Sequence, residues 1–175
     1  FCKNIHVSLN EDNSVTVTDD GRGIPTDIHK EAGISAATVV LTELHAGGKF
    51  DNDSYEYSGG LHGVGISVSC FLSQWLKLEI YRDGKISYQE FECGRPLEPL
   101  RTIGKTSKTG TSITFLPDKT VFSSMVWSYA KIAERIEELA YLNAGISITL
   151  TEARKDKKQS SIVFKYTDGI KAFIA

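Results

Sequence analysis

Apolar and polar residues alternate along several short stretches of the chain, which is the pattern of half-buried β-strands. These stretches are residues 4–10, 14–20, 75–82, 85–92, 111–117, 146–151 and 161–166. Asp83-Gly84 lies between two of them and is a strong hairpin signal, and a polar turn at 11–13 joins the first two. Residues 94–110, rich in Gly, Pro, Lys and Thr, are expected to form a connection rather than an element.

Apolar residues recur at three- or four-residue spacing elsewhere, which predicts helices. Residues 34–46 place four of them on one face, namely Ala37, Val40, Leu41 and Leu44. A long helix capped by Ser123 or Ser124 would end near 143–145 and carry Trp127, Ala130, Ala133, Ile136 and Ala140. A further helix should extend from the glycine-rich stretch 58–67 to about Leu72, and Asp168 could cap a short last helix.

Hairpins interspersed with helices predict an α+β fold, in which helices pack on one face of a mixed or antiparallel sheet. With 175 residues, 41% of them hydrophobic, the chain is expected to form a single domain over 1–175. The charged run 154–158 is interpreted as a solvated hairpin tip rather than a nucleic-acid patch.

Composition excludes several classes of function. The formal net charge is −2 without a long basic run, which argues against direct duplex binding. The three cysteines and four histidines lack metal-ligand spacing, so free thiols in a reducing, cytoplasmic compartment and no structural metal are expected. No apolar run approaches the ~20 residues of a membrane span. Because the chain begins with Phe1 almost directly at a strand, it is interpreted as a piece of something longer.

A glycine-rich stretch, Gly59-Gly60-Leu61-His62-Gly63-Val64-Gly65, leads into one predicted helix. Glycines before a helix leave backbone N–H groups pointing outward, where the positive end of the helix dipole suits a phosphate. The stretch is neither a Walker A loop, because Ile66 stands where the lysine should be, nor a dinucleotide fingerprint, because a polar loop precedes it. The polar segment 49–57 before it is a candidate lid.

A second motif, 19–25, reads Asp-Asp-Gly-Arg-Gly-Ile-Pro at the end of a predicted strand. The motif contains two acids, two glycines and a proline at the strand end, and this composition indicates a backbone that turns sharply and stays accessible. Asp-Gly is also the commonest turn dipeptide, so this motif alone is equally compatible with a simple turn.

Two further motifs are His45-Ala46-Gly47-Gly48-Lys49-Phe50 and Thr109-Gly110-Thr111. With these four motifs in this order, the chain strongly resembles the ATPase domain of bacterial type II topoisomerases. This family comprises the B subunit of DNA gyrase and its topoisomerase IV counterpart, and it belongs to the Bergerat-fold superfamily. The stretch 139–146 resembles gyrase more than topoisomerase IV. The resemblance implies a two-layer sandwich of helices on a mixed, mostly antiparallel sheet, with ATP between the helices.

The resemblance also implies roles for individual residues. Asp19 would accept a hydrogen bond from the adenine amino group, with Gly21, Gly23 and Thr111 nearby, and Ile24, Pro25 and Val40 would sandwich the base. The phosphates would lie on Gly59, Gly60, Leu61, His62, Gly63, Val64 and Gly65, with Lys49 and Tyr55 contributed by the lid. Arg22, Arg82, Val17 and Ile113 would border an inhibitor pocket. Glu56 departs from the family pattern, which has lysine there, and receives no phosphate role.

In the family, a helix before the first strand supplies the general-base glutamate and a magnesium-binding asparagine, both expected upstream of Phe1. A transducer domain and an amino-terminal arm are likewise expected outside this chain. The full protein would use ATP with Mg²⁺ and act with a second copy of itself, with the gyrase A subunit, and with DNA. The fragment itself is expected to be hydrolytically incompetent. A module that holds nucleotide without turnover, and another Bergerat family such as a chaperone or kinase, are the alternatives.

Overall fold

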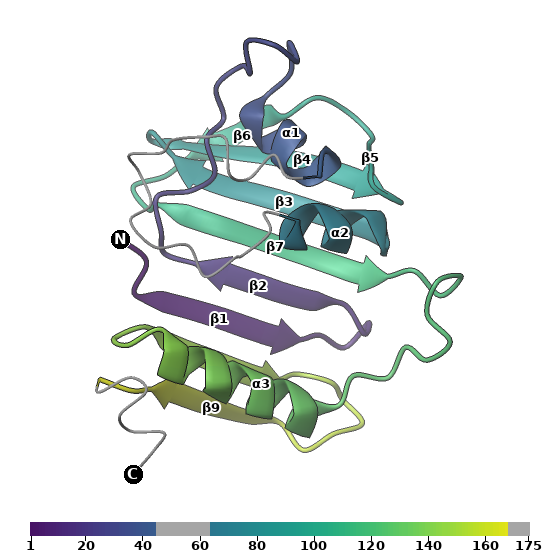
Figure 1. Cartoon of the computed structure of the whole chain (residues 1–175), viewed down its shortest axis with the longest axis vertical. Helices are drawn as coiled ribbons and strands as arrows, with labels where there is room; N and C mark the ends of the chain where they lie inside the picture. The colour runs from purple at the N-terminus through teal and green to yellow at the C-terminus, as the bar shows by residue number, and fades with distance from the viewer. Residues whose placement is uncertain (45–63, 168–175) are drawn as a thin grey trace.

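The computed structural model describes residues 1–44 and 64–167, which form one nine-stranded sheet with three helices on one face (Figure 1). The strand order is β5-β4-β3-β7-β2-β1-β8-β9, and β6 also pairs with β4. Only β1 and β8 pair in parallel among the described strands; every other pair is antiparallel. This mixed, mostly antiparallel α+β architecture confirms the predicted fold class.

The elements have the following bounds. The strands are β1 (Asn4–Leu9), β2 (Val15–Asp19), β3 (Ser73–Arg82), β4 (Lys85–Glu92), β5 (Arg95–Pro96), β6 (Arg101–Lys105), β7 (Gly110–Pro117), β8 (Ser147–Glu152) and β9 (Ser160–Lys165). The helices are α1 (Ala36–Thr42), α2 (Gly65–Phe71) and α3 (Tyr129–Leu142).

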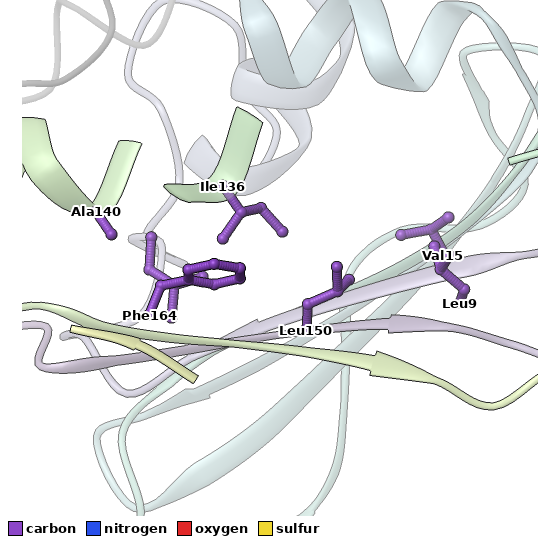
Figure 2. Close-up of a cluster of buried hydrophobic side chains, with 7 residues drawn as sticks. Leu9, Val15, Ile136, Ala140, Leu150 and Phe164 are labelled. Carbon is purple, nitrogen blue, oxygen red and sulfur yellow. The ribbon is translucent and has the colours of Figure 1, made fainter. Parts of the chain in front are cut away.

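Helix packing divides the covered face of the sheet into two apolar clusters. Helix α3 packs over β1, β2, β8 and β9 through Leu9, Val15, Ile136, Ala140, Ile148, Leu150 and Phe164 (Figure 2). Helices α1 and α2 cover β3 and β4 through Ala37, Leu41, Cys70, Leu76, Leu78, Ile80 and Phe91. Val17 of β2 packs against the first cluster and its register partner Ile113 of β7 against the second. The β2–β7 pair is therefore the boundary between the two helical groups.

The other face of the sheet is polar, which explains the alternation in the sequence. Hydroxyl groups pair across strands there, with Thr16 and Thr114 Oγ1 atoms 2.9 Å apart and Thr18 Oγ1 3.0 Å from Ser112 Oγ. These bonds join β2 to β7 from the side opposite the helices.

Most predicted strands are confirmed, and the Asp83-Gly84 turn adopts the expected conformation, with φ of 51° and 75°. Three expectations are wrong. Residues 94–110 contain β5 and β6, both paired with β4. The long helix begins at Tyr129 with Ser128 as its cap, so Trp127 precedes the helix. The helix predicted over 34–46 is shorter, because the backbone becomes extended at Glu43 after Thr42, and Leu44 is exposed rather than part of the apolar face. The predicted terminal helix lies outside the described residues.

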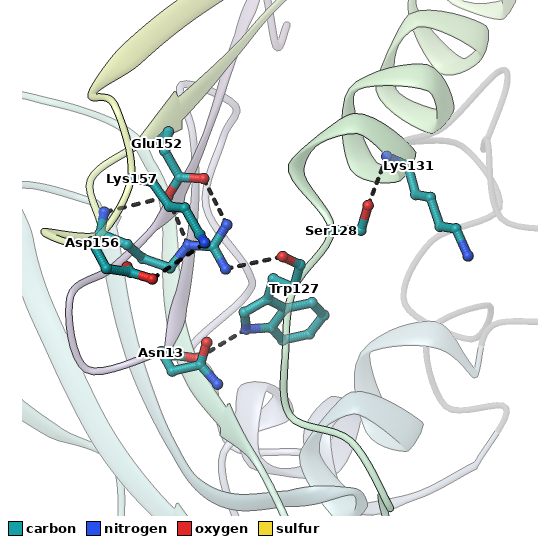
Figure 3. Close-up of polar contacts among 8 residues, drawn as sticks. Asn13, Trp127, Ser128, Lys131, Glu152, Asp156 and Lys157 are labelled. Carbon is teal, nitrogen blue, oxygen red and sulfur yellow. Dashed lines mark hydrogen bonds and ion pairs between the residues drawn. The ribbon is translucent and has the colours of Figure 1, made fainter.

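The segment before α3 is anchored by a buried ion pair (Figure 3). The interpretation of 154–158 as a solvated tip holds for 155–158, which are exposed, and is wrong for Arg154 alone. Arg154 and Glu152 are only 6% and 4% exposed. Arg154 Nε and Nη2 donate to the two Glu152 carboxylate oxygens at 2.7 and 2.6 Å, and Nη1 donates to the Trp127 carbonyl at 2.9 Å. Trp127 Nε1 in turn donates to the Asn13 carbonyl at 2.9 Å. The β8–β9 turn and the β1–β2 turn thus hold the same loop.

Replacing Arg154 by Met should cost about 3–5 kcal/mol of unfolding free energy, because it leaves the Glu152 carboxylate buried without its cation. Hydrogen bonds from Arg154 hold the pKa of Glu152 below its usual value, so this stabilisation should be lost as the pH falls through that lowered pKa. Urea unfolding measures both effects.

The double variant Glu152→Leu/Arg154→Met is the matched control for this prediction. It removes both charges and should be less destabilised than Arg154→Met alone. The assignment of an ion pair would be contradicted if the double variant lost as much unfolding free energy as Glu152→Leu and Arg154→Met lose together.

Candidate functional site

Asp19 ends β2 opposite Thr111 of β7 and is half-buried. Its Oδ1 accepts a hydrogen bond from the Gly21 backbone N–H at 2.8 Å, and the Thr111 backbone N–H also donates to the carboxylate. Burial raises the pKa of Asp19 against the lowering effect of these two bonds. A carboxylate has about four acceptor positions, so this oriented group keeps capacity for a ligand donor.

The adjacent Asp20 has a different role. Its carboxylate accepts from the Lys3 and Asn4 backbone N–H groups at 2.7 and 2.9 Å and from Asn4 Nδ2 at 2.6 Å. These bonds hold the pKa of Asp20 far below its usual value. Asp20 therefore ties the start of β1 to the end of β2, and of the two acids Asp19 is the one suited to a ligand.

Two glycines allow the backbone to close around Asp19. A Cβ on Gly110, whose φ is 142°, would lie 2.0 Å from the Asp19 carbonyl oxygen. A Cβ on Gly23, whose φ is 77°, would lie 2.9 Å from the Tyr81 carbonyl oxygen and 3.0 Å from that of Gly110. Side chains at either position would push β2, β7 or the 20–24 loop away, so the site depends on both glycines.

Arg82 and Thr111 hold the loop that follows Asp19. Arg82 Nη1 donates to the Gly23 carbonyl at 2.9 Å, and the buried Thr111 hydroxyl accepts from the Ile24 N–H at 3.3 Å. The Arg22 guanidinium lies 4.4 Å from the centre of the Phe1 ring. The loop is thus fixed by contacts to two strands as well as by the Gly21–Asp19 bond within its own turn.

Apolar side chains of the predicted site pack against both core clusters. Ile24, Val40 and Ile113 all pack against the cluster beneath α1 and α2, while Val17 packs against the other cluster. Pro25 is half-buried next to Ile24. Together these residues supply apolar surface close to one oriented carboxylate.

A buried polar chain fixes α1 and therefore Val40. The Thr38 hydroxyl donates to Gln89 Oε1 at 2.8 Å, Ser35 Oγ lies 2.7 Å from Thr38 Oγ1, and Gln89 Nε2 donates to the Glu98 carbonyl at 2.8 Å. Gln89 is 1% exposed, so each of these bonds replaces one to water.

The structure brings many of the predicted site residues together at the end of the β2–β7 pair. They are Val17, Asp19, Gly21, Arg22, Gly23, Ile24, Arg82, Thr111 and Ile113. Val64 and Gly65 form the start of α2. Lys49, Tyr55, Glu56, Gly59, Gly60, Leu61, His62 and Gly63, and with them the lid, lie outside the described residues.

Sequence reasoning missed two contributors. Gly110 belongs to a recognised motif but has no role in the sequence-based assignment, although it makes the closest approach to Asp19. The Thr38–Gln89 bond joins residues that are 51 positions apart, and no local sequence pattern predicts a contact of this kind.

The described residues offer no site for magnesium. No group of three or more His, Cys, Asp and Glu side chains among them could hold a metal ion, and both aspartates of the loop are engaged by backbone donors. No helix in the described part of the chain is long and apolar enough to cross a membrane.

Comparison with known families identifies the fold. Residues 1–121 match the family described as histidine kinase-, DNA gyrase B-, and HSP90-like ATPase. The chain belongs to this ATPase family. The predicted resemblance is thereby confirmed.

Several relatives of this chain are B subunits of type II topoisomerases. The chain is 48% identical to the DNA gyrase B subunit of Borreliella burgdorferi and to that of Halalkalibacterium halodurans, over 99% of the chain and 27% of each relative. It is 47% identical to the type 2 topoisomerase B subunit of Aquifex aeolicus, over 99% of the chain and 22% of that protein. The chain thus spans about a quarter of the length of the curated relatives it matches.

A solved structure agrees with these relatives. The 43K ATPase domain of Thermus thermophilus gyrase B, in complex with an aminocoumarin, superimposes with a TM-score of 0.84 at 36% identity. The match covers 99% of this chain and 43% of that one.

Replacing Gly110 by Ala should cost at least about 3 kcal/mol of unfolding free energy, because the new Cβ meets the Asp19 carbonyl in a backbone conformation that alanine disfavours. Gly84→Ala is the control, since Gly84 also has a positive φ but has no atom within 4 Å of its Cβ position. It should cost only about 1 kcal/mol. Equal costs in chemical denaturation would mean that β7 does not approach β2 as described.

Proposed function

We propose that this chain binds ATP and forms the nucleotide-binding core of a gyrase-like type II topoisomerase. The full protein would couple ATP hydrolysis to DNA strand passage and supercoiling. The observation that carries the proposal is the Asp19 carboxylate, held by the Gly21 and Thr111 N–H groups beside an apolar surface. The gyrase relatives and the aminocoumarin complex of a similar domain support it.

Adenine recognition follows from the chemistry of a carboxylate. The adenine amino group donates to Asp19, whereas guanine presents a carbonyl oxygen at that position and would set two acceptors face to face. The backbone of Gly21 and Gly23 and the Thr111 hydroxyl would complete the polar contacts, partly through water. Ile24, Pro25 and Val40 would hold the purine between apolar surfaces.

The phosphates would lie toward the start of α2, at Val64 and Gly65. We assign Lys49, Tyr55, Gly59, Gly60, Leu61, His62 and Gly63 to the same phosphate contacts. Mg²⁺ would accompany ATP in the full protein, but the described residues do not fit it, so their role is to bind and orient the nucleotide. The general base for hydrolysis is likewise assigned to no described residue.

Partners and inhibitors follow from the same assignment. The full protein would act with a second copy of itself, with the gyrase A subunit and with DNA. Its compartment would be the cytoplasm, in keeping with the three free cysteines. Arg22, Arg82, Val17 and Ile113 would border the pocket for an adenine-site inhibitor such as an aminocoumarin. Arg82 reaches the Gly23 carbonyl from one side of this loop.

Asp19→Asn tests the proposal. The substitution preserves shape but can turn an amide N–H toward the base and removes a charge-assisted bond worth about 1.5–3 kcal/mol. Affinity for ATP should fall about ten- to a hundredfold in isothermal titration calorimetry. Because burial raises the pKa of Asp19, the ionised carboxylate costs folding free energy at neutral pH, so the melting temperature should not fall.

Asp20→Asn is the matched control, because it changes the neighbouring acid in the same way. It should lower the melting temperature by weakening the bonds to Lys3 and Asn4 while leaving nucleotide affinity close to that of the unmodified chain. Equal ATP affinity in Asp19→Asn and the unmodified chain, with both folded, would show that Asp19 only braces its turn.

A further inference from the structure

Three basic residues lie in one cross-strand row beside the candidate site. Arg82 of β3 is opposite Lys85 of β4, and Lys85 is opposite Lys105 of β6. Arg82 and Lys85 share their strand faces with Ile80 and Ser87, so the row lies on the face that carries the helices. Both lysines are exposed. Like charges directly opposite each other in a sheet repel, so this arrangement has a cost in stability.

Local acids compensate this charge only in part. Asp83 lies 3.4 Å from Arg82 Nε, but its side chain is 77% exposed. Arg82 Nε is buried and makes no hydrogen bond to any described residue. Neither Lys85 nor Lys105 forms an ion pair within the described ranges. A further exposed lysine, Lys108, lies in the turn that follows Lys105. The row is therefore a positive patch on a chain of net charge −2.

The row begins at the site and extends away from it. Arg82 Nη1 bonds the Gly23 carbonyl at 2.9 Å, and the next two members lie on successive strands toward the sheet edge (Figure 1). The Thr106 N–H donates to the Gly84 carbonyl at 3.0 Å, which ties the turn after β6 to the turn between β3 and β4. The charges are thus carried by paired strands at a fixed distance from the Gly23 loop.

We propose that the row Arg82, Lys85 and Lys105 is an electrostatic entry surface that speeds the capture of anionic adenine nucleotides by the neighbouring site. This inference rests on the proposed function. A chain of negative net charge repels an approaching polyphosphate, and a local cationic patch at the rim reverses that field where the ligand arrives. Such attraction acts over about 8–10 Å in physiological salt, so the lysines need not touch the bound nucleotide.

The double variant Lys85→Gln/Lys105→Gln tests the proposal by stopped-flow fluorescence with methylanthraniloyl-labelled ATP. At about 20 mM ionic strength the association rate constant should fall about three- to tenfold, and at about 0.5 M the difference should nearly vanish. The dissociation rate constant should stay nearly unchanged, because the proposal gives the two lysines a role in the approach of the nucleotide and not in its bound contacts. Arg82 is kept, since its bond to Gly23 also shapes the site.

Two controls separate local steering from other effects. The double variant Lys157→Gln/Lys158→Gln removes the same amount of charge from exposed positions in the β8–β9 turn. This turn and Asp19 lie at opposite ends of the strands β8, β1 and β2. The variant should therefore leave the association rate constant nearly unchanged. Labelled adenosine, which carries no phosphate, should associate equally fast with both double variants.

Equal association rates in the unmodified chain and Lys85→Gln/Lys105→Gln at low salt would overturn the inference while leaving ATP binding intact. An equal loss in the Lys157→Gln/Lys158→Gln variant, or an equal loss with labelled adenosine, would overturn it as well. Absence of ATP binding to the unmodified chain would instead overturn the proposed function together with the inference.

Discussion

The close contact between the end of β2 and the start of β7 is the constraint on which the rest of the site depends. Gly110 lies so near the Asp19 carbonyl that no side chain fits between them. This approach lets the Thr111 N–H reach the Asp19 carboxylate and its hydroxyl reach the Ile24 N–H. One backbone contact therefore sets the position of the carboxylate and of the loop that follows it.

The two apolar clusters meet at the strand pair that makes this contact. Because α3 packs at one side of the sheet and α1 and α2 at the other, the β2–β7 pair is shared between them. Phe115 of β7 packs against both clusters and joins them in the same strand. The Thr38–Gln89 bond then fixes α1, which carries Val40, on its cluster. The strands that carry the two clusters therefore also carry the candidate site, and Val17, Ile24 and Ile113 belong to both.

Much of the fold could be predicted because strands buried on one face alternate visibly in sequence. Leu76, Leu78 and Ile80 are fully buried, and the polar residues between them face outward. The strands β5 and β6 were missed because they pair only with the edge of β4 and bury little, leaving no alternation. The positions of Trp127 and Arg154 were predicted wrongly because their burial comes from contacts with distant segments, which local spacing does not record.

The same distinction applies to the site. The acidic, glycine-rich motif 19–25 was recognisable as a unit, and family resemblance supplied the role of Asp19. The sequence does not distinguish Asp19 from Asp20, because their difference depends on which backbone N–H groups each carboxylate meets after folding. The role of Gly110 could not be predicted from local sequence either, because it depends on the contact of Gly110 with Asp19 on the neighbouring strand.

The carboxyl ¹³C titration of Asp19, followed by NMR with and without saturating adenosine, tests the central claim most directly. Burial should place the pKa of Asp19 above that of an ordinary aspartate in the free chain. If adenine binds the ionised carboxylate, linkage requires that adenosine lower this pKa, while guanosine leaves it unchanged. An Asp19 pKa that does not move at saturating adenosine would contradict the account.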